Sequence, residues 1–311
     1  MVVQLIIYLA AFFFIWIGAD LLVNSVVRLA HKLNLSSFAV SFFVLGILTS
    51  IPELSVGISS IIDKDPQIFV GNLIGASFML FMLIVPILAI FGNGIKLAHQ
   101  LTERNLIFSL FVILTPIIFI SDGIITRKEG LFMILIYSLL FYFIEKRKGL
   151  LEKVHDRLFD GTKEGPVDLG KIVLGSIIVF LSSKILVDKT IYFANVFGIS
   201  PFLISLLLLS VGTNLPEFSI VVDSIFKKHK EVAFGDYIGS AAANTFLFGF
   251  LALINGPFTI ESGYFFLTFI LFALGIVLFY VFSRSKKDIS RQEGIALLLV
   301  YVFFIVFELI Q

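Results

Sequence analysis

Glu53 and Glu217 are carboxylates set inside long apolar stretches of the chain, and a proline directly precedes each of them. A charged side chain at the depth of a bilayer is costly, and such residues usually face a cavity, a polar partner or a transported ion. For either glutamate taken alone, a protonated side chain hydrogen-bonded between helices is the alternative. Hydroxyl and amide side chains accompany both acids, at Thr49, Ser50, Thr213 and Asn214. Hard cations such as Ca²⁺ and Na⁺ prefer oxygen ligands of these types, so the pattern predicts a cation site.

The prolines add to this chemistry. Pro52 and Pro216 lack an N–H, which frees the carbonyl four residues earlier, at Leu48 and Gly212, and bends the helix there. A freed carbonyl at membrane depth needs a neighbouring helix, a hydroxyl, water or a cation as its partner. A simple kink is the plainer interpretation of each proline. With the surrounding hydroxyls and carboxylates, we interpret these carbonyls as part of an oxygen-rich cage.

The two acidic stretches are copies of one another. Residues 45–82 recur later in the chain at one constant offset, without insertion or deletion. The matching pairs are Thr49 and Thr213, Pro52 and Pro216, Glu53 and Glu217, Gly71 and Gly235, Ile74 and Ile238, and Gly75 and Gly239. An internal duplication with an acid in each half is typical of secondary transporters whose site lies between the repeats.

Composition identifies the solvent that the surface must face. Hydrophobic residues make up 59% of the 311 residues and charged residues only 14%, and the mean hydropathy is +1.06. These values are typical of an integral membrane protein. The chain has no cysteine, which excludes disulfides, thiolate metal sites and cysteine nucleophiles, and its four histidines make a histidine metal cluster an unfavoured interpretation.

The apolar segments predict ten membrane-spanning helices, because about 20 apolar residues cross the hydrocarbon layer. They cover about residues 3–27, 37–62, 68–92, 105–121, 129–145, 170–195, 201–226, 232–255, 262–283 and 292–310. The first segment resembles a signal peptide in hydropathy, but it lacks a basic n-region and an obvious small-residue cleavage site. We therefore interpret it as the first span.

The ten spans form two halves. The predicted fold is an all-α integral membrane protein whose first repeat covers residues 1–146 and whose second covers residues 169–311, joined by a linker at 147–168. The duplicated segments lie at about 37–92 and 201–255. Because each half contains five spans, an odd number, the second copy enters the membrane facing the other way. The repeats are therefore predicted to be inverted.

Basic residues predict the orientation. When successive loops between the ten spans are assigned alternately to the two sides of the membrane, 18 of the 23 Lys and Arg residues fall on one side and 5 on the other. Cytoplasmic loops carry the excess of basic residues in membrane proteins. This bias predicts that the 147–168 linker is cytoplasmic and that both termini lie outside, in what we expect to be the plasma (inner) membrane.

Small and polar residues define the helices that follow each acid. Glycines spaced for close helix packing occur in both copies, at Gly71, Gly75, Gly235 and Gly239. Packing alone accounts for them, and close approach also brings Ser240, Asn244 and Ser77 toward the glutamates. Our candidate cation ligands are therefore Glu53, Glu217, Thr49, Thr213, Ser50, Asn214, Asn244, Ser240, Ser210 and Ser77.

Other polar residues within the apolar segments have simpler interpretations. Asn72 and Asp236 are predicted to cap helices near the membrane surface. Asp20, Lys184 and Asp188 are predicted to lie near helix ends or in polar pairs, with a gating role as the less favoured hypothesis.

The paired motifs resemble those of a known family. In the first copy, the motifs are Leu48-Thr49-Ser50-Ile51-Pro52-Glu53 and Gly71-Asn72-Leu73-Ile74-Gly75-Ala76. In the second copy, they are Gly212-Thr213-Asn214-Leu215-Pro216-Glu217 and Gly235-Asp236-Tyr237-Ile238-Gly239-Ser240. Together they are similar to the α-repeats of the Ca²⁺/cation antiporter superfamily, most closely the sodium/calcium exchanger branch. The resemblance implies ten helices in inverted halves and a central cluster of four cation sites used alternately by Na⁺ and Ca²⁺. It also implies that Glu53, Glu217, Thr49, Thr213 and Ser50 are ligands.

The chain departs from the family pattern at several positions. Leu48 stands where the family has a glycine, Asn214 and Ala76 where it has serines, and Leu80 where it has an Asn or Asp. Asn244 retains that amide in the second repeat. Two carboxylates still neutralise one Ca²⁺ or two Na⁺, but additional Na⁺ ions need the neutral oxygens that are missing. We therefore expect the divalent site to be better preserved than the monovalent sites.

The resulting hypothesis is a secondary active antiporter that exchanges Ca²⁺ for Na⁺ by alternating access, without a cofactor and with the bilayer and inorganic cations as its partners, and with no nucleic acid. A proton-coupled or other-cation exchanger is an alternative, although the G-N-x-x-E motif of the proton/calcium branch is missing. A degenerate scaffold that does not transport is a second alternative. A membrane enzyme with paired acid and base glutamates is a third, but no nucleophile or cofactor loop supports it.

Overall fold

The structure is a computed structural model that describes residues 1–32, 49–96, 103–148, 165–215, 217–218, 230–260, 265–285 and 288–310. Every one of the ten predicted spans contains a helix. The helices are α1 (Val2–Lys32), α4 (Ile51–Ile62), α5 (Gln67–Met79), α6 (Val85–Phe91), α7 (Glu103–Phe119), α8 (Arg127–Lys148), α9 (Gly165–Phe197), α10 (Pro201–Ile204), α11 (Ser210–Thr213), α13 (Lys230–Asn255), α14 (Phe265–Ser285) and α15 (Arg291–Ile310). The all-α prediction is confirmed.

Two of the spans contain a wider helical turn. A π-helical segment, η2 (Leu80–Ile84), joins α5 to α6, and a second, η5 (Ser205–Leu209), joins α10 to α11. A short 3₁₀ segment, η3 (Ile120–Asp122), ends α7. Among the described residues, five helical segments are long and apolar enough to cross a membrane, namely Val2–Leu21, Gln67–Phe91, Glu103–Asp122, Gly170–Phe197 and Tyr237–Asn255.

Four two-residue strands show the relation between the two halves. β1 (Ile95–Lys96) pairs antiparallel with β4 (Asp288–Ile289), and β2 (Ile124–Ile125) pairs with β3 (Phe258–Thr259). The offset that relates Glu53 to Glu217 also maps β2 onto β4, and it maps β1 onto β3 to within a single position. Each pair therefore joins a loop of the first half to a loop of the second. Their equivalent positions extend the repeat beyond the acidic stretches.

Matching capping boxes begin α8 and α15. Thr126 and Glu129 bond reciprocally: the Thr126 backbone N–H donates to Glu129 Oε2 at 2.7 Å, and the Glu129 N–H donates to Thr126 Oγ1. Ser290 and Glu293 do the same, with 2.8 Å between the Ser290 N and Glu293 Oε2. These bonds satisfy backbone donors that the first helical turn leaves open. The two boxes are related by the same constant offset as the acids, so the start of the fifth span is repeated as well.

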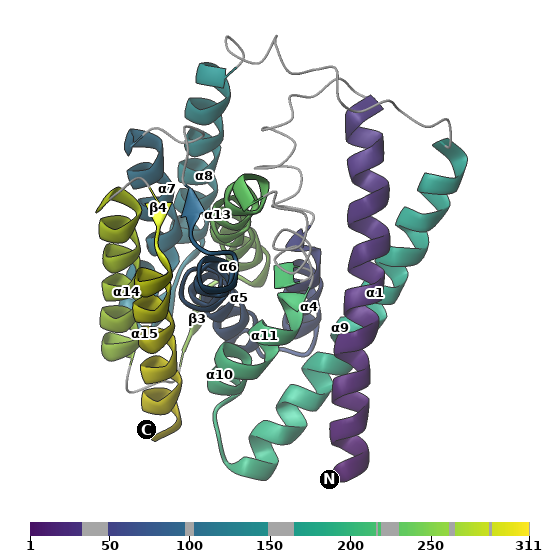
Figure 1. Ribbon diagram of the computed structural model, residues 1–311. Helices are drawn as coiled ribbons and strands as arrows, with labels where there is room; N and C mark the ends of the chain where they lie inside the picture. The colour runs from purple at the N-terminus through teal and green to yellow at the C-terminus, as the bar shows by residue number, and fades with distance from the viewer. Residues whose placement is uncertain are drawn as a thin grey trace.

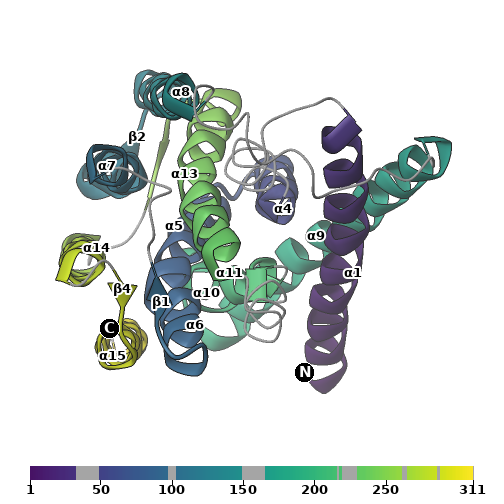
Figure 2. The same cartoon turned by 45° about the horizontal axis from the view of Figure 1, so that its top comes forward.

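The α5–η2–α6 segment forms the centre of the molecule. In Figures 1 and 2, α7, α8, α14 and α15 lie on one side of the group formed by α4, α5, α10, α11 and α13, and α1 and α9 lie on the other. Glycines allow α5 to approach its neighbour closely. A Cβ on Gly71 would lie 2.3 Å from the Phe202 carbonyl oxygen, and one on Gly75 would lie 2.2 Å from that of Leu206. No side chain fits at these two crossing points.

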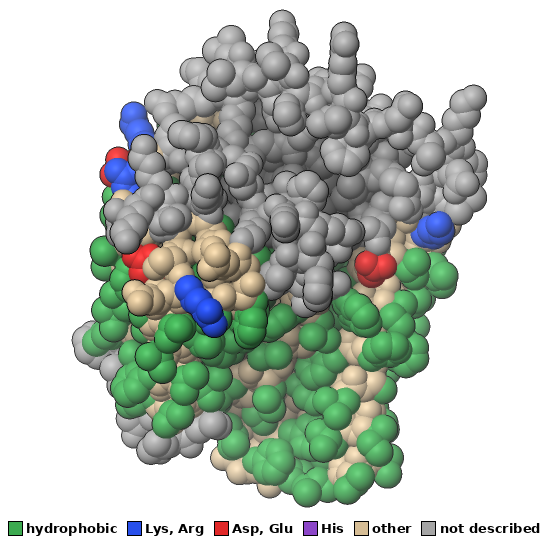
Figure 3. All heavy atoms as spheres, viewed as in Figure 1, with side chains coloured by type: hydrophobic (Ala, Val, Ile, Leu, Met, Phe, Trp, Pro, Cys, Tyr) green, Lys and Arg blue, Asp and Glu red, His purple; other side chains and the backbone are tan. Residues whose placement is uncertain are grey.

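α1 and α9 form a pair at the edge of the molecule (Figures 1 and 2). The buried Tyr8 hydroxyl lies 3.1 Å from Thr190 Oγ1 and links the two helices. Gly18 on α1 faces Val179 on α9 closely enough that a Cβ would lie 2.9 Å from the valine side chain. The lower part of the face in Figure 3, which includes this pair, is covered mainly by hydrophobic side chains. This surface suits contact with lipid.

Several polar residues do not lie where the sequence predicted. Asn72 is inside α5 and buried, and Asp236 is inside α13, so neither caps a helix. Lys184 and Asp188 are exposed in the middle of α9, far from its ends. Among the described residues, neither has an ion-pair partner. Asp20 is also exposed inside its helix, twelve residues before the end of α1, so it does not lie near a helix end either.

Candidate cation-binding site

Both acidic stretches contain a helix break at equivalent residues. Ser50 has φ −85° and ψ 10°, and Asn214, its counterpart in the second repeat, has φ −88° and ψ 13°. Behind each break a new helical turn begins: the Leu54 N–H donates to the Ser50 carbonyl, and the Phe218 N–H donates to that of Asn214. The spans are therefore interrupted there, where the sequence predicted a bend around a proline. Pro52 lies in the first turn of α4, whereas Leu48 and Pro216 are outside the described residues.

The breaks place polar helix ends beside the acids. Glu53 lies in the first turn of α4, where the positive end of the helix dipole favours a negative charge. Thr213 is the last residue of α11, at the end where open carbonyls favour a cation. Interrupted helices with ends of this kind surround the ion sites of many secondary transporters. The backbone thus supports a carboxylate and a cation side by side.

The two carboxylates are buried and close together. Glu53 is 1% exposed and Glu217 is fully buried. The carboxyl groups interact electrostatically, and each faces the threonine of the other repeat: Thr213 lies within hydrogen-bonding reach of Glu53, and Thr49 within reach of Glu217. Two negative charges this close repel each other unless a cation or a proton lies between them. The crossed pairing is what a two-fold relation between the repeats produces.

Ser240 of α13 connects the hydroxyls to an acid. Its hydroxyl donates to Glu217 Oε1 at 3.0 Å, and it lies 3.2 Å from Thr49 Oγ1 and 3.3 Å from Ser50 Oγ. All four side chains are buried. Residues from both repeats therefore meet in one polar cluster, and α13 supplies its central hydroxyl.

The asparagines use their amide nitrogens within the protein. Asn214 Nδ2 donates to the Ser210 carbonyl at 2.8 Å, and Asn244 Nδ2 donates to Ser77 Oγ at 3.3 Å. These bonds orient the amides so that each carbonyl oxygen is left for another partner. Both asparagines are buried. Their Oδ1 atoms are therefore candidate neutral ligands.

Within the polar cluster, four buried acceptor oxygens have no donor among the residues that the structure describes. They are Glu53 Oε2, Glu217 Oε2, Asn214 Oδ1 and Asn244 Oδ1. A buried acceptor without a partner costs about 1–3 kcal/mol, and more when it is charged. Polar groups in protein interiors are nearly always paired, so an exception calls for a bound ion, a water or a proton. No group of three or more His, Cys, Asp or Glu side chains occurs in the described part of the chain. A cation here would depend on two carboxylates and neutral oxygens.

Two of the predicted ligands, Ser210 and Ser77, hold the candidate asparagine ligands in place by hydrogen bonds. The Ser210 hydroxyl donates to the Leu206 carbonyl at 2.6 Å, and the Ser210 carbonyl accepts from Asn214, so Ser210 orients that asparagine. Ser77 accepts from Asn244 in the same manner. Of the predicted packing glycines in α13, Gly239 is buried, and Gly235 lies in the helix with its surroundings outside the described residues.

Asn72 belongs to the cluster, which the sequence interpretation missed. Thr213 Oγ1 donates to Asn72 Oδ1 at 3.1 Å, joining α11 to α5. Helical spacing was the available signal, because Asn72 lies on the same face of α5 as Gly75 and Ala76, three and four residues later. A polar residue on the glycine face must point at the neighbouring helix.

Thr245 is a second residue that the interpretation missed. Pro116 lies inside α7 and leaves the Val112 carbonyl without its usual N–H donor. The Thr245 hydroxyl of α13 donates to that carbonyl at 3.0 Å. Thr245 follows Asn244 directly, so this bond fixes α13 against α7 next to a candidate ligand. A proline within an apolar span was the signal that a donor is required nearby.

The departures from the family pattern are buried in the core. Leu80 is the first residue of η2 and has no exposed surface, and it packs within the main hydrophobic cluster. Ala76 is likewise buried. Neither residue offers a side-chain oxygen. Beyond the two helix breaks, α13 contributes Ser240 and Asn244 to the cluster, and α5 contributes Asn72 and Ser77.

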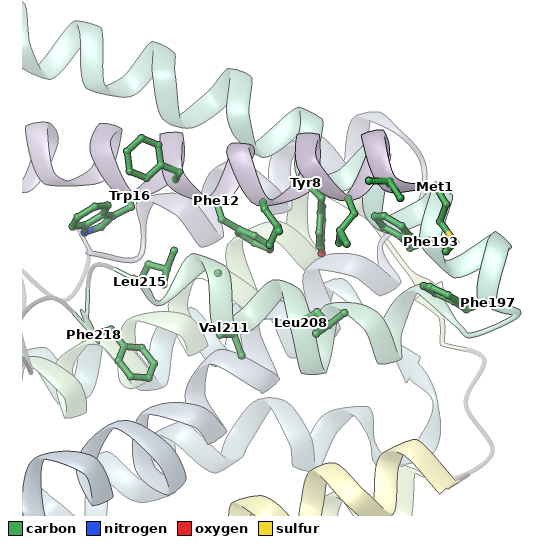
Figure 4. A pocket seen from close by; sticks show the side chains of 15 residues that line it. Met1, Tyr8, Phe12, Trp16, Phe193, Phe197, Leu208, Val211, Leu215 and Phe218 are labelled. Atoms are coloured by element: carbon green, nitrogen blue, oxygen red, sulfur yellow. The ribbon is translucent and has the colours of Figure 1, made fainter. Parts of the chain in front are cut away.

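An apolar groove lies apart from the polar cluster. It has a volume of about 860 Å³ and lies between the α1–α9 pair and the η5–α11 segment, as Figure 4 shows. Aromatic side chains such as Phe12, Trp16 and Phe197 line it. Gly212 forms part of its wall, and the Phe12 ring packs so tightly on it that a Cβ would lie 1.8 Å from the ring. α11 therefore turns an apolar face to the groove and Thr213 to the cation cluster.

Comparison with known proteins gives a consistent result. The sequence profile of the family described as "Sodium/calcium exchanger protein" matches residues 3–144 and 168–310. The chain is 27% identical, over 98% of both chains, to "Sodium/calcium exchanger MaX1" of Methanosarcina acetivorans. It is 24% identical to "Inner membrane protein YrbG" of Escherichia coli, over 76% of both chains.

Solved structures share the fold. The sodium-calcium exchanger NCX_Mj, soaked with 2.5 mM Na⁺ and 0.1 mM Ca²⁺, superposes with a TM-score of 0.68 at 21% identity and covers 98% of both chains. The "H+/Ca2+ Exchanger CAX" superposes with a TM-score of 0.79 at 15% identity, over 98% of this chain and 86% of that chain. The predicted fold, a helical membrane protein built from two repeats, is confirmed.

Proposed function

Because the chain belongs to the sodium/calcium exchanger protein family, we propose that it exchanges Ca²⁺ for Na⁺ across the membrane by alternating access. The chain is a membrane cation antiporter by family, and the choice of Na⁺ as the coupling ion is the proposal. The relative MaX1 carries sodium/calcium exchanger in its name. Two carboxylates neutralise either one Ca²⁺ or two Na⁺, which allows the two ions to compete for one site.

The observation that carries the proposal is the set of four buried oxygens without donors. Glu53 and Glu217 contribute one carboxylate oxygen each, and Asn214 and Asn244 one amide oxygen each. Thr49, Thr213, Ser50 and Ser240 add hydroxyls around them. A Ca²⁺ ion accepts about six to eight oxygen ligands, carboxylates among them. This cluster offers ligands of the right type and charge for one such ion.

Alternating access follows from the repeats in this proposal. Glu53 lies in the first turn of α4 and Thr213 ends α11, and Glu217 and Thr49 are their counterparts in the other repeat. A site between inverted repeats opens to either side when the halves rearrange around it. We assign residues 1–146 and 169–311 to the two repeats.

Proton coupling is the second candidate function. Ala76 and Leu80 remove two neutral oxygens that extra Na⁺ ions would use. Buried carboxyl groups can instead take up protons when no cation is bound. The structural neighbour CAX is titled an H⁺/Ca²⁺ exchanger. The same two glutamates would then carry protons in one direction and Ca²⁺ in the other.

Transport in proteoliposomes distinguishes these functions. The purified protein is reconstituted, and ⁴⁵Ca²⁺ uptake is measured under an outward Na⁺ gradient and, separately, an outward H⁺ gradient. Uptake driven by Na⁺ supports the proposal, and uptake driven only by H⁺ supports the second candidate. Glu53→Gln and Glu217→Gln serve as controls. Failure of uptake under both gradients, with Ca²⁺ binding also missing, would identify a scaffold that does not transport.

The location follows from family and charge. The chain is an integral membrane protein, and we place it in the plasma membrane with both termini outside and the 147–168 linker in the cytoplasm. The excess of basic residues on the linker side supports this orientation. The relative YrbG is named an inner membrane protein.

A further inference from the structure

Two opposite charges lie on the outer surface of a membrane-spanning helix. Lys184 and Asp188 are both exposed on α9. The apolar part of α9 covers Gly170–Phe197, and Lys184 is at its centre, about 20 Å along the axis from either end at 1.5 Å per residue. Asp188 follows one helical turn later. Both charges therefore lie near the middle of the bilayer.

The same face of α9 is otherwise apolar. Val173, Ile177 and Leu181 are 59%, 51% and 58% exposed. At about 100° per residue, these three side chains fall on one stripe with Lys184 and Asp188. The opposite face of α9, including Val179 and Leu186, is buried against α1 and α4. The charged pair thus occupies the centre of the outward-facing stripe.

Charged side chains at this depth rarely face hydrocarbon. They usually face the bundle interior, a water-filled cavity or an opposite charge. Among the described residues, neither Lys184 nor Asp188 has an ion-pair partner. Figures 1 and 2 show α9 at the edge of the molecule, and none of the described helices lies outside it. The described part of the chain thus leaves this stripe uncovered, and a second protein surface would shield its charges from hydrocarbon.

We propose that the α9 stripe is the interface between two copies of this chain. In a dimer whose two-fold axis lies along the membrane normal, α9 faces the α9 of the partner subunit and runs in the same direction. Lys184 then meets Asp188 of the partner subunit, and Asp188 meets the partner's Lys184. The two charges on one stripe, one turn apart, are complementary to themselves under this symmetry. The interface pairs all four charges and covers the apolar residues around them.

The alternative is an ion pair within one helix. Lys184 and Asp188 are four residues apart, a spacing at which side chains on a helix can interact. A monomer with such a pair would still expose it to lipid. The experiment therefore tests both the association and its dependence on charge.

Cysteine cross-linking measures the association directly, because the chain has no cysteine of its own. Leu181→Cys places one thiol on the stripe, one turn from Lys184. The purified variant is reconstituted into liposomes and treated with a short bifunctional thiol reagent. We expect a covalent dimer on a denaturing gel. Leu299→Cys, on the exposed face of α15 where Leu299 is 63% exposed, is the matched control and should stay monomeric.

Charge reversal tests the pairing in the Leu181→Cys background. Lys184→Asp and Asp188→Lys should each lower the cross-linked fraction by at least about fivefold, because like charges then meet across the interface. The double variant that exchanges the two charges should restore it. Lys171→Asp, on the same helix away from the stripe, should leave cross-linking unchanged.

A variant without charges on the stripe shows whether a loss of cross-linking comes from the missing charges or from failure to fold. Lys184→Met combined with Asp188→Asn makes α9 easier to insert, so the protein should reach the membrane, but it should lose the dimer. A Leu181→Cys protein that does not cross-link and counts as a monomer by single-molecule photobleaching would overturn the proposal. Cross-linking that is indifferent to the single reversals, or retained in the neutral variant, would overturn it equally.

Discussion

At the scale of single residues, the cluster separates donors from acceptors. The amide nitrogens of Asn214 and Asn244 and the Ser240 hydroxyl donate within the protein, to Ser210, Ser77 and Glu217. Asn72 Nδ2 is the exception in the described cluster, because it has no acceptor there. The oxygens that remain are two from carboxylates and two from amides. A cation needs only acceptors. The arrangement therefore favours a positive ligand over a neutral or anionic one.

Removing either carboxylate charge should remove divalent binding. Glu53→Gln and Glu217→Gln keep the side-chain shape, and each should weaken Ca²⁺ binding at least about tenfold, because interactions with a charged group are worth about 1.5–3 kcal/mol. Equilibrium binding of ⁴⁵Ca²⁺ to the purified protein measures this. Asp65→Asn, in the connector between α4 and α5, is the matched control and should bind normally. Unchanged affinity in either glutamine variant would disprove the site.

The repeat supplies its own control for Na⁺ binding. Leu80 occupies the position equivalent to Asn244. Leu80→Asn should strengthen competition by Na⁺ against Ca²⁺, and Asn244→Leu should weaken it or abolish transport. A neutral ligand is worth about 1 kcal/mol, or roughly fivefold in apparent Na⁺ affinity. Leu80→Met keeps an apolar side chain and should behave as the unmodified protein. If Na⁺ competes equally in both variants, position 80 does not face the ions.

At the scale of helices, close packing decides how the polar residues meet. α5 crosses the α10–η5 segment at Gly71 and Gly75, where backbone carbonyls occupy the space that a side chain would need. This contact holds Asn72 next to Thr213 at the end of α11. Apolar helices in lipid gain little from the hydrophobic effect, so close van der Waals contact becomes the main packing force. The geometry of the cluster thus depends on two glycines.

A methyl group at that crossing should destabilise the protein. Gly75→Ala would place a Cβ 2.2 Å from the Leu206 carbonyl oxygen, and overpacking of this kind costs about 1–3 kcal/mol. Gly170→Ala is the control, because a Cβ there meets nothing within 4 Å and alanine favours the helix. Thermal unfolding in detergent should show a lower midpoint for the first variant only. Equal midpoints would mean that α5 can move away without cost.

The bond from Thr245 to Val112 allows a sharper test. Thr245→Val should destabilise the protein by about 1 kcal/mol, because it leaves the carbonyl opposite Pro116 without a donor. Pro116→Ala returns an N–H to α7, so Thr245→Val should cost less in that background. Unfolding free energies of the two single variants and the double variant form a cycle. Additive effects would show that the hydroxyl and the proline act independently.

At the scale of the whole molecule, the two halves are joined on both sides of the polar cluster. The β1–β4 and β2–β3 pairs connect the halves through their loops, and α5 packs between α13 and the α10–η5 segment. The α1–α9 pair remains at the edge, with the apolar groove of Figure 4 between it and α11. The cluster is thus enclosed by elements of both repeats, while the groove at the edge is lined mainly by apolar side chains.

Orientation in the membrane can be read from outside the cell. Cysteines introduced at Thr162 and Gln311, both outside the described residues, should react differently with an impermeant thiol reagent in intact cells. Gln311→Cys should be labelled, because the C-terminus is expected outside, and Thr162→Cys should be labelled only after permeabilisation. The unmodified protein, which has no cysteine, is the negative control. Labelling of Thr162→Cys alone in intact cells would reverse the proposed topology.

The sequence by itself determined the features that depend on composition and spacing. Long apolar segments predicted ten spans, because crossing hydrocarbon requires a certain number of apolar residues wherever they pack. The constant offset between the two copies paired Glu53 with Glu217, because a duplication is visible without coordinates. It did not reveal which side chains meet. Only the tertiary structure brought Asn72 to Thr213 and Thr245 to the Val112 carbonyl, since these contacts join helices far apart in the chain. Nor did the sequence place Lys184 and Asp188, because a helix that is apolar on every side gives no periodic signal of which face it buries.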